Sequence, residues 1–136
     1  MCNPCKYAFP AVLTLADAVL TLAGQPAAYW RDFAKADEAF PAFAELLHIH
    51  PAAFLAAALA WIAAYCLVIR ALPRWPSLVV SVSFMTGHFV GCLTWLLLRF
   101  HIPFPCVLLL FPLFASAVVF LVHGVTKGQV FRIRSP

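Results

Sequence analysis

Asp17 is the residue of this sequence whose type and position point most directly to chemistry. It stands at the centre of the apolar stretch 8–24, with Thr14 three residues before it and Thr21 four residues after it. Residues at these spacings share one face of a helix. An acid at this depth of a membrane helix is costly, so it should face other helices and find a polar partner there. The pattern predicts a polar site inside a membrane.

His88 is the expected partner of Asp17. It lies halfway along the apolar stretch 77–98, so the two side chains should reach the same depth near the bilayer midplane. A lone charge is disfavoured there, and we expect the pair to be either fully ionised or sharing one proton. The hydroxyl groups expected to complete its hydrogen bonds belong to Thr14, Thr21, Ser81 and Thr86. Two interpretations stay open: a proton-relay or ligand site, and a hydrogen bond that only fixes helix register.

Histidines near the ends of the apolar stretches are candidates for metal binding. Imidazole and carboxylate groups suit transition-metal ions, and the residues expected on one side of the membrane are His48, His50, His101, Glu38 and Glu45. The alternative is that these histidines cap helices or lie at the surface. Cys2 and Cys5 have the spacing of half a zinc site, but the second pair is missing. We therefore predict no cofactor and no metal, and no motif of a known enzyme class supports catalysis.

The composition defines the environment of these residues. Hydrophobic residues make up 65% of the chain and charged residues 10%, and the mean hydropathy is +0.96. Soluble domains are about half apolar and about a quarter charged. Since so few charges could not cover the surface of a soluble domain, we expect a single transmembrane domain over residues 1–136. The net charge of +4 then implies contact with lipid headgroups and not with nucleic acid.

Three apolar stretches, 51–71, 77–98 and 103–124, are each long enough for a helix to cross a hydrocarbon core of about 30 Å. The stretch 8–24 is shorter and contains an acid, but it can still span with slight local thinning of the bilayer. The sequence therefore predicts an all-α, polytopic membrane helical bundle with four transmembrane helices. Pro112 should kink the last of them.

The long loop, residues 25–50, is amphipathic. Its apolar residues recur at helical spacing and its charged residues take the positions between them. Pro41 should break it into two short helices. Such a segment can lie along the membrane interface, or its apolar face can cap the end of the bundle, and the sequence favours neither alternative.

Small residues recur at intervals of four in two of the predicted spans. Helices in lipid associate through close approach at such residues. The packing faces predicted on this basis comprise Ser83, Gly87, Gly91, Ala56, Ala60 and Ala64.

The basic residues of the short loops predict the orientation. With the N-terminus inside, six Lys and Arg residues fall on the cytoplasmic side and three on the other. We therefore expect both termini in the cytoplasm of a bacterial cytoplasmic (inner) membrane. The basic tail, residues 125–136, would rest on anionic headgroups or on a partner subunit.

Two short motifs resemble those of a known family. The chain contains LADAVLT around Asp17, then EAFP from Glu38, then an apolar span. This order is similar to a family of small multi-pass bacterial membrane proteins of unknown function, whose pattern is a first-helix Asp, a Thr four residues on, and then Glu-x-Asn-Pro. The similarity covers about residues 10–71, and Phe40 stands where the family has Asn. The resemblance implies that Asp17, Thr21 and Glu38 act together, with Glu38 reaching back over the mouth of the bundle.

The function expected from these features is that of a non-enzymatic integral membrane protein. It would be an accessory or structural component that associates with itself or with a larger membrane complex through its small-residue faces and basic tail. One alternative is a small proton-coupled or ligand-binding transporter centred on Asp17 and His88. A further alternative is an intramembrane redox or metal enzyme that uses the outer histidines.

Overall fold

The computed structural model describes residues 5–133, with side chains described for residues 7–124. Its elements in chain order are α1 (Cys5–Ala23), the 3-10 helix η1 (Phe33–Lys35), α2 (Pro41–Ile49), α3 (Pro51–Ala71), α4 (Arg74–Leu98), α5 (Phe104–Leu108) and α6 (Leu110–Ile133). Within the described residues there are helices and no strands, which confirms the all-α prediction. Cys2 lies outside this range, as do the basic side chains of the tail.

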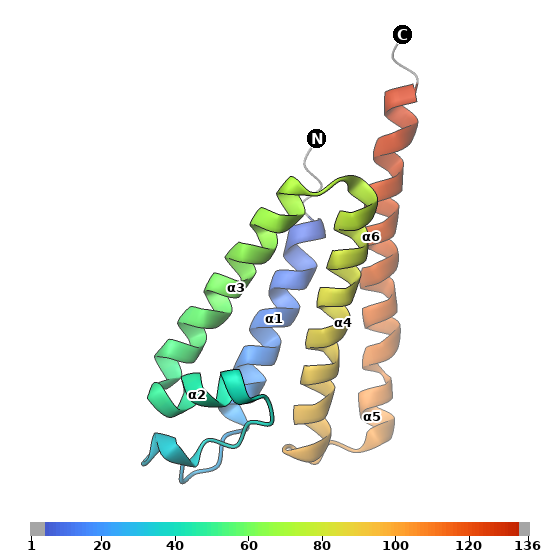
Figure 1. Ribbon diagram of the computed structural model, residues 1–136. Coiled ribbons are helices and arrows are strands. Elements are labelled where there is room, and N and C mark those ends of the chain that lie inside the picture. Colours follow the sequence, from blue (N-terminus) through green and yellow to red (C-terminus); the bar gives the residue numbers. More distant parts are fainter. Residues whose placement is uncertain (1–4, 134–136) are drawn as a thin grey trace.

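The long helices α1, α3, α4 and α6 run alternately up and down beside one another (Figure 1). α1 contacts each of the other three, and α4 contacts α3 and α6. The start of α1, the turn between α3 and α4 and the end of α6 lie towards one end of the bundle, whereas α2 and α5 lie at the other (Figure 1). The helix that contains Asp17 therefore packs against all three other long helices, while Val12, Leu15 and Val19 on its remaining face are exposed.

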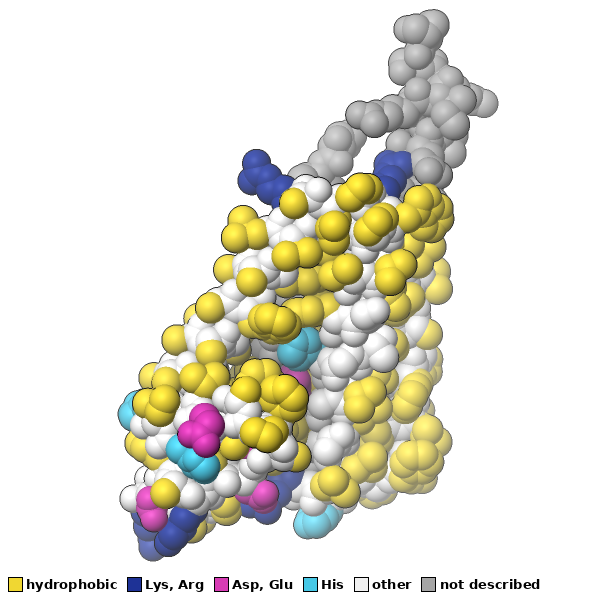
Figure 2. All heavy atoms as spheres, viewed as in Figure 1, with side chains coloured by type: hydrophobic (Ala, Val, Ile, Leu, Met, Phe, Trp, Pro, Cys, Tyr) yellow, Lys and Arg dark blue, Asp and Glu magenta, His cyan; other side chains and the backbone are white. Residues whose placement is uncertain are grey.

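Three helical segments are long and apolar enough to cross a membrane: Pro51–Ala71, Arg74–Leu98 and Phe104–Gly124. They correspond to the three longer predicted spans, and their composition is that of a membrane protein. The apolar part of α1 that is described, Tyr7–Ala23, is shorter. Large apolar side chains cover much of the outer face of the bundle (Figure 2).

Prolines begin two of the helices where the sequence predicts a start. Pro41 and Pro51 occupy the first turns of α2 and α3, where a missing N–H costs no intrahelical hydrogen bond. Between these helices, the backbone of His50 is extended and its Nδ1 accepts a hydrogen bond from the N–H of Ala52 at 3.1 Å. This is an N-cap, and it turns the chain from α2 into α3.

The last apolar stretch differs from a single kinked span. It is divided into α5 and α6 at Leu109, whose backbone N–H bonds within a tight turn. Pro112 has no N–H to offer the carbonyl of Leu108, and its ring crowds that carbonyl, so the helix is interrupted one turn before the proline. At its other end, α6 continues to Ile133, beyond the predicted boundary at residue 124, and the chain has no proline between 113 and 135 that would stop it.

The long loop packs onto the end of the bundle. Tyr29 is fully buried in a cluster with Ala18 of α1, Leu47 of α2 and Phe54 of α3. Its hydroxyl donates to the backbone carbonyl of Leu47 at 3.2 Å, and burial raises the pKa of Tyr29 above its ordinary value. The sequence leaves open whether the apolar face of the loop lies along the membrane interface or caps the bundle. In the structure this face caps the end of the bundle, and Trp30 is half-exposed.

Polar contacts tie the same loop to the ends of α1 and α4. The side-chain amide of Gln25 accepts from the N–H of Asp37 at 2.8 Å and donates to its carbonyl at 3.2 Å. From the end of α4, Nε of Arg99 donates to the carbonyl of Gly24, and its guanidinium lies 3.4 Å from the carboxylate of Asp37. These contacts hold the segment that follows α1 against the end of α4.

Candidate functional site

The structure brings Asp17 and His88 together, although they are 71 residues apart in the chain. Nδ1 of His88 and Oδ2 of Asp17 are joined by a hydrogen bond of 2.8 Å. The contact joins α1 to α4, the two helices that share the most extensive contact in the bundle. A charge-assisted hydrogen bond of this length is among the stronger side-chain contacts of proteins.

Gly91 allows the Asp17 side chain to approach α4. A Cβ atom at this position would lie 2.5 Å from Oδ1 and 2.7 Å from Oδ2 of the carboxylate. The carboxylate therefore lies directly against the α4 backbone, one helical turn from His88. Gly87, one turn earlier, is different, because a Cβ there would meet nothing within 4 Å.

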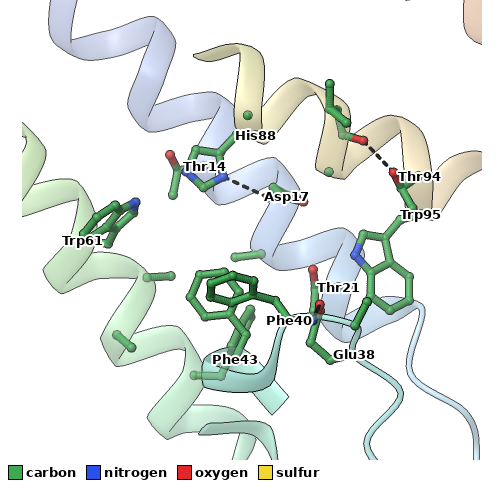
Figure 3. A pocket seen from close by; sticks show the side chains of 18 residues that line it. Thr14, Asp17, Thr21, Glu38, Phe40, Phe43, Trp61, His88, Thr94 and Trp95 are labelled. Atoms are coloured by element: carbon green, nitrogen blue, oxygen red, sulfur yellow. Dashed lines mark hydrogen bonds and ion pairs between the residues drawn. The ribbon is translucent and has the colours of Figure 1, made fainter. Parts of the chain in front are cut away.

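Both members of the pair face a cavity of about 540 Å³. Its walls come from α1, α3 and α4, and residues 38–43 of the long loop close one end. The side chains of Asp17 and His88 keep 20% and 15% of their surface exposed. Figure 3 shows Asp17 near the middle of this space, with Trp61 on one side and Trp95 on the other. The cavity is largely apolar apart from the pair and a few hydroxyl and carboxyl groups.

Aromatic rings support the imidazole. Phe84 meets His88 edge to face, with ring centroids 4.7 Å apart. Phe84 in turn stacks on Tyr65 at 4.4 Å and on Trp61 at 6.0 Å. This row of rings connects α3 to α4 and limits how far His88 can turn away from the carboxylate.

Glu38 lies at the loop end of the same cavity, near Thr21 (Figure 3). Its Oε1 accepts a hydrogen bond from the N–H of Phe40 at 3.0 Å, which fixes the turn before α2. The structure thus places Asp17, Thr21 and Glu38, the three residues joined by the family resemblance, on the lining of one cavity. The shared role that the resemblance implies for them stays a prediction.

Three of the predicted supporting hydroxyls do not serve the pair. Those of Thr14, Ser81 and Thr86 each donate to the carbonyl four residues earlier on their own helix, at 2.8 to 2.9 Å. Ser81 is also bonded to the hydroxyl of Tyr65 at 2.7 Å. The prediction that these groups complete the hydrogen bonds of Asp17 and His88 is therefore wrong for them, because a carbonyl of the preceding turn is always within reach of a helical hydroxyl. Thr21 is buried and lines the cavity.

The small residues predicted to form packing faces do not all contact another helix. Only Gly91 among them allows a close interhelical contact of the kind expected, and the side chains of Ser83, Ala56, Ala60 and Ala64 are exposed. Within one chain these four residues are not packing sites, because α3 and α4 direct them away from the other helices. Whether they form a face for another protein stays a prediction.

The outer histidines do not gather into a cluster. Nδ1 of His50 is occupied as the cap of α3, and His48 is exposed on α2. His101 follows α4 with a positive φ of 52°, in the turn towards α5. In the part of the chain that the structure describes, no three His, Cys, Asp or Glu side chains are close enough to hold a metal ion.

The aromatic lining of the cavity could not be identified from the sequence. The regular spacing of the loop aromatics predicts an apolar face, but not that Phe40 and Phe43 close a cavity around Asp17.

No family model, curated protein or solved structure was found that matches the chain. The arrangement is that of a helical membrane protein with an acid and an imidazole paired inside an apolar cavity.

Proposed function

We propose that this chain is an integral membrane protein that binds a small amphipathic molecule in the cavity around Asp17 and His88. The observation that supports this function best is that the pair keeps part of its surface exposed inside an apolar cavity of about 540 Å³. If this hydrogen bond only fixed the register of α1 and α4, we would expect side chains to cover it completely. A polar group that faces an apolar cavity finds no partner there that compensates for its lost hydration. Binding sites for small molecules have volumes of about 300–1,000 Å³ and a few polar groups among apolar ones.

The membrane topology that we propose has four crossings: α1, α3, α4 and the pair α5 and α6. α1 is included because it packs along all three longer spans, and its 19 residues reach about 28 Å. An even number of crossings agrees with the start of α1 and the end of α6 lying towards one end of the bundle (Figure 1). The excess of Lys and Arg towards that end favours the cytoplasm of a bacterial inner membrane for both termini.

The position of the cavity suggests how a ligand would reach it. Trp61 on α3 and Val90 on α4 line it and are each 53% exposed, and Gly87 beside them has open space at its Cβ. In the proposed topology this open side faces lipid. A molecule that partitions into the bilayer would therefore enter between α3 and α4, with its polar group towards Asp17.

Native mass spectrometry tests this function. The full chain would be purified from its own membrane in mild detergent and compared with Gly87→Phe, which fills the cavity from α4. We expect the wild type to retain a small amphiphile that Gly87→Phe loses. The matched control is Val119→Phe on α6, where the side chain is 65% exposed and outside the cavity. A bound amphiphile retained equally by all three proteins, or none in the wild type, would contradict the proposal.

A second candidate, the accessory or self-associating membrane component, is favoured by one observation. Ala56, Ala60 and Ala64 form an exposed row of small side chains along α3, a surface suited to another transmembrane helix. If this role is correct, Ala60→Leu should reduce copurification of a second protein or copy, whereas Leu59→Ala beside the row should not.

A further inference from the structure

The cavity around Asp17 is acidic. Asp17 and Glu38 both line it, and among its lining residues, all of which the structure describes, there is neither Lys nor Arg. Arg99, which lines an adjoining pocket together with Glu38, is bound to the carbonyl of Gly24 and lies 3.4 Å from Asp37. The lining thus contains two carboxyl groups and a single imidazole, that of His88, so that with both acids ionised it carries an excess of negative charge whether or not His88 is protonated.

The apolar part of the lining is rich in aromatic rings. Phe40 and Phe43 have centroids 5.1 Å apart, and Phe43 meets Phe54 at 5.9 Å, so that they form a continuous wall. Trp61 and Trp95 lie on opposite sides of Asp17 (Figure 3). Aromatic faces attract cations within about 6 Å, and Trp does so most strongly. Carboxylate and rings thus favour the same sign of charge.

The orientation of the carboxylate is fixed before any ligand arrives. His88 binds Oδ2, and the missing side chain of Gly91 lets the carboxylate lie against the α4 backbone. A site that is already oriented loses less conformational entropy on binding. An anionic ligand would be repelled by the two acids, and an uncharged ligand would leave the excess negative charge of the lining uncompensated in an apolar space.

We propose that the ligand is an organic cation with apolar substituents, such as a protonated amine or a quaternary ammonium, and that Asp17 is its counter-ion. This inference rests on the proposed function and names its ligand class. The aromatic rings surround the apolar substituents, and the opening between α3 and α4 admits the molecule from lipid. Glu38 extends the acidic character of the cavity to its loop end.

The test uses probes of nearly the same shape and different charge. The full chain in micelles of an uncharged detergent is titrated with tetraphenylphosphonium, tetraphenylborate and the uncharged tetraphenylsilane. Binding is measured by equilibrium dialysis and by the fluorescence of Trp61 and Trp95, assigned with single Trp→Phe variants. We expect saturable binding of the cation at about one per chain, at least about tenfold tighter than that of either other probe.

Two variants of equal charge change separate the site from the net charge of the protein. Asp17→Asn should weaken binding of the cation by about tenfold or more, whereas Glu45→Gln, an exposed acid outside the cavity, should leave it unchanged. Should Asp17→Asn fail to fold, as judged by circular dichroism, the comparison of the three probes on the wild type still decides the question.

The outcomes distinguish the ligand class from the function itself. If the uncharged probe or the anion binds as tightly as the cation, and Gly87→Phe abolishes that binding, the cation proposal is overturned and the ligand-binding function stands. If no probe binds, the cation proposal is also overturned. The proposed function then fails too, provided that native mass spectrometry finds no amphiphile that Gly87→Phe removes.

Discussion

Gly91 has an influence on the site that is out of proportion to its size. Its Cα is the surface on which the carboxylate of Asp17 lies, and the hydrogen bond to His88 depends on this approach. Gly87 offers a natural comparison on the same helix, because it has no neighbour within 4 Å of where a Cβ would be. The two glycines share a sequence spacing but not a physical role.

We expect Gly91→Ala to destabilise the protein and Gly87→Ala not to. Overpacking against the carboxylate costs about 1–3 kcal/mol, and the better helix propensity of alanine returns up to about 1 kcal/mol. At Gly87 only the favourable propensity effect remains. The measurement is the free energy of unfolding of both variants in mixed micelles, together with the imidazole NMR signals of His88. Equal stability changes in the two variants would contradict this account of Gly91.

At this scale the sequence predicts part of the site. Asp17 and His88 can be paired in advance because each stands midway along an apolar stretch, and depth in a membrane is a constraint that sequence position reveals. The hydrogen-bond partners of Ser81 and Thr86 cannot be predicted in this way, because a helical hydroxyl has a carbonyl of its own helix within reach wherever the neighbouring helices lie. To predict the close approach of Asp17 to Gly91, one would have to know how α1 and α4 are rotated relative to each other. The spacing of small residues does not determine this rotation.

The long loop shows how elements without a regular repeat are held in place. Arg99 joins the end of α4 to the carbonyl that follows α1 and to Asp37 in the loop. Gln25 binds the backbone of Asp37 from the other side. The segment that closes the cavity, residues 38–43, begins directly after this anchor.

We expect Arg99→Met to loosen the loop. Two interactions are lost: the hydrogen bond to Gly24, and an ion pair that contributes little because its Asp37 side is largely exposed. Together they amount to about 1 kcal/mol. Amide hydrogen exchange should rise in residues 25–43 and stay unchanged in α3. Lys35→Met is the matched control, since its ion pair with Asp32 is 3.9 Å long and exposed. Faster exchange in both variants, or in neither, would show that Arg99 is not the anchor.

The helices themselves are largely predictable, because the apolar stretches are long and prolines mark several of their starts. The exceptions have local causes. α5 and α6 are separated at Leu109 because Pro112 removes one hydrogen bond and crowds a carbonyl, and the sequence predicts the disturbance but not whether the helix bends or breaks there. The loop cap follows from the burial of Tyr29, which an amphipathic pattern alone does not distinguish from a lipid interface.

For the whole molecule, the proposed topology places the long loop on one side of the membrane and the turn between α3 and α4 on the other. The two segments lie at opposite ends of the bundle (Figure 1). The charge distribution that favours this orientation acts during insertion, through the Lys and Arg residues of the short loops.

Labelling of single cysteines tests this topology. In a chain whose own cysteines are replaced by serine or alanine, Lys35→Cys should react with a membrane-impermeant maleimide in intact cells. Arg74→Cys should react only after permeabilisation. The reverse result would invert the orientation, and labelling of both positions in intact cells would mean an even number of crossings between them, which contradicts the single crossing by α3.

The central position of α1 has a consequence for biosynthesis. A chain leaves the ribosome from its N-terminus at about 5–20 residues per second, so α1 reaches the membrane before His88, which follows Asp17 by 71 residues, has been made. Among the described helices, the one that packs against the three other long helices is thus synthesised before them, and its acid lacks His88 as a partner at that time. Stable insertion of α1 is therefore expected to await α4, so that truncation of the nascent chain before residue 88 would leave the first helix extractable from the bilayer.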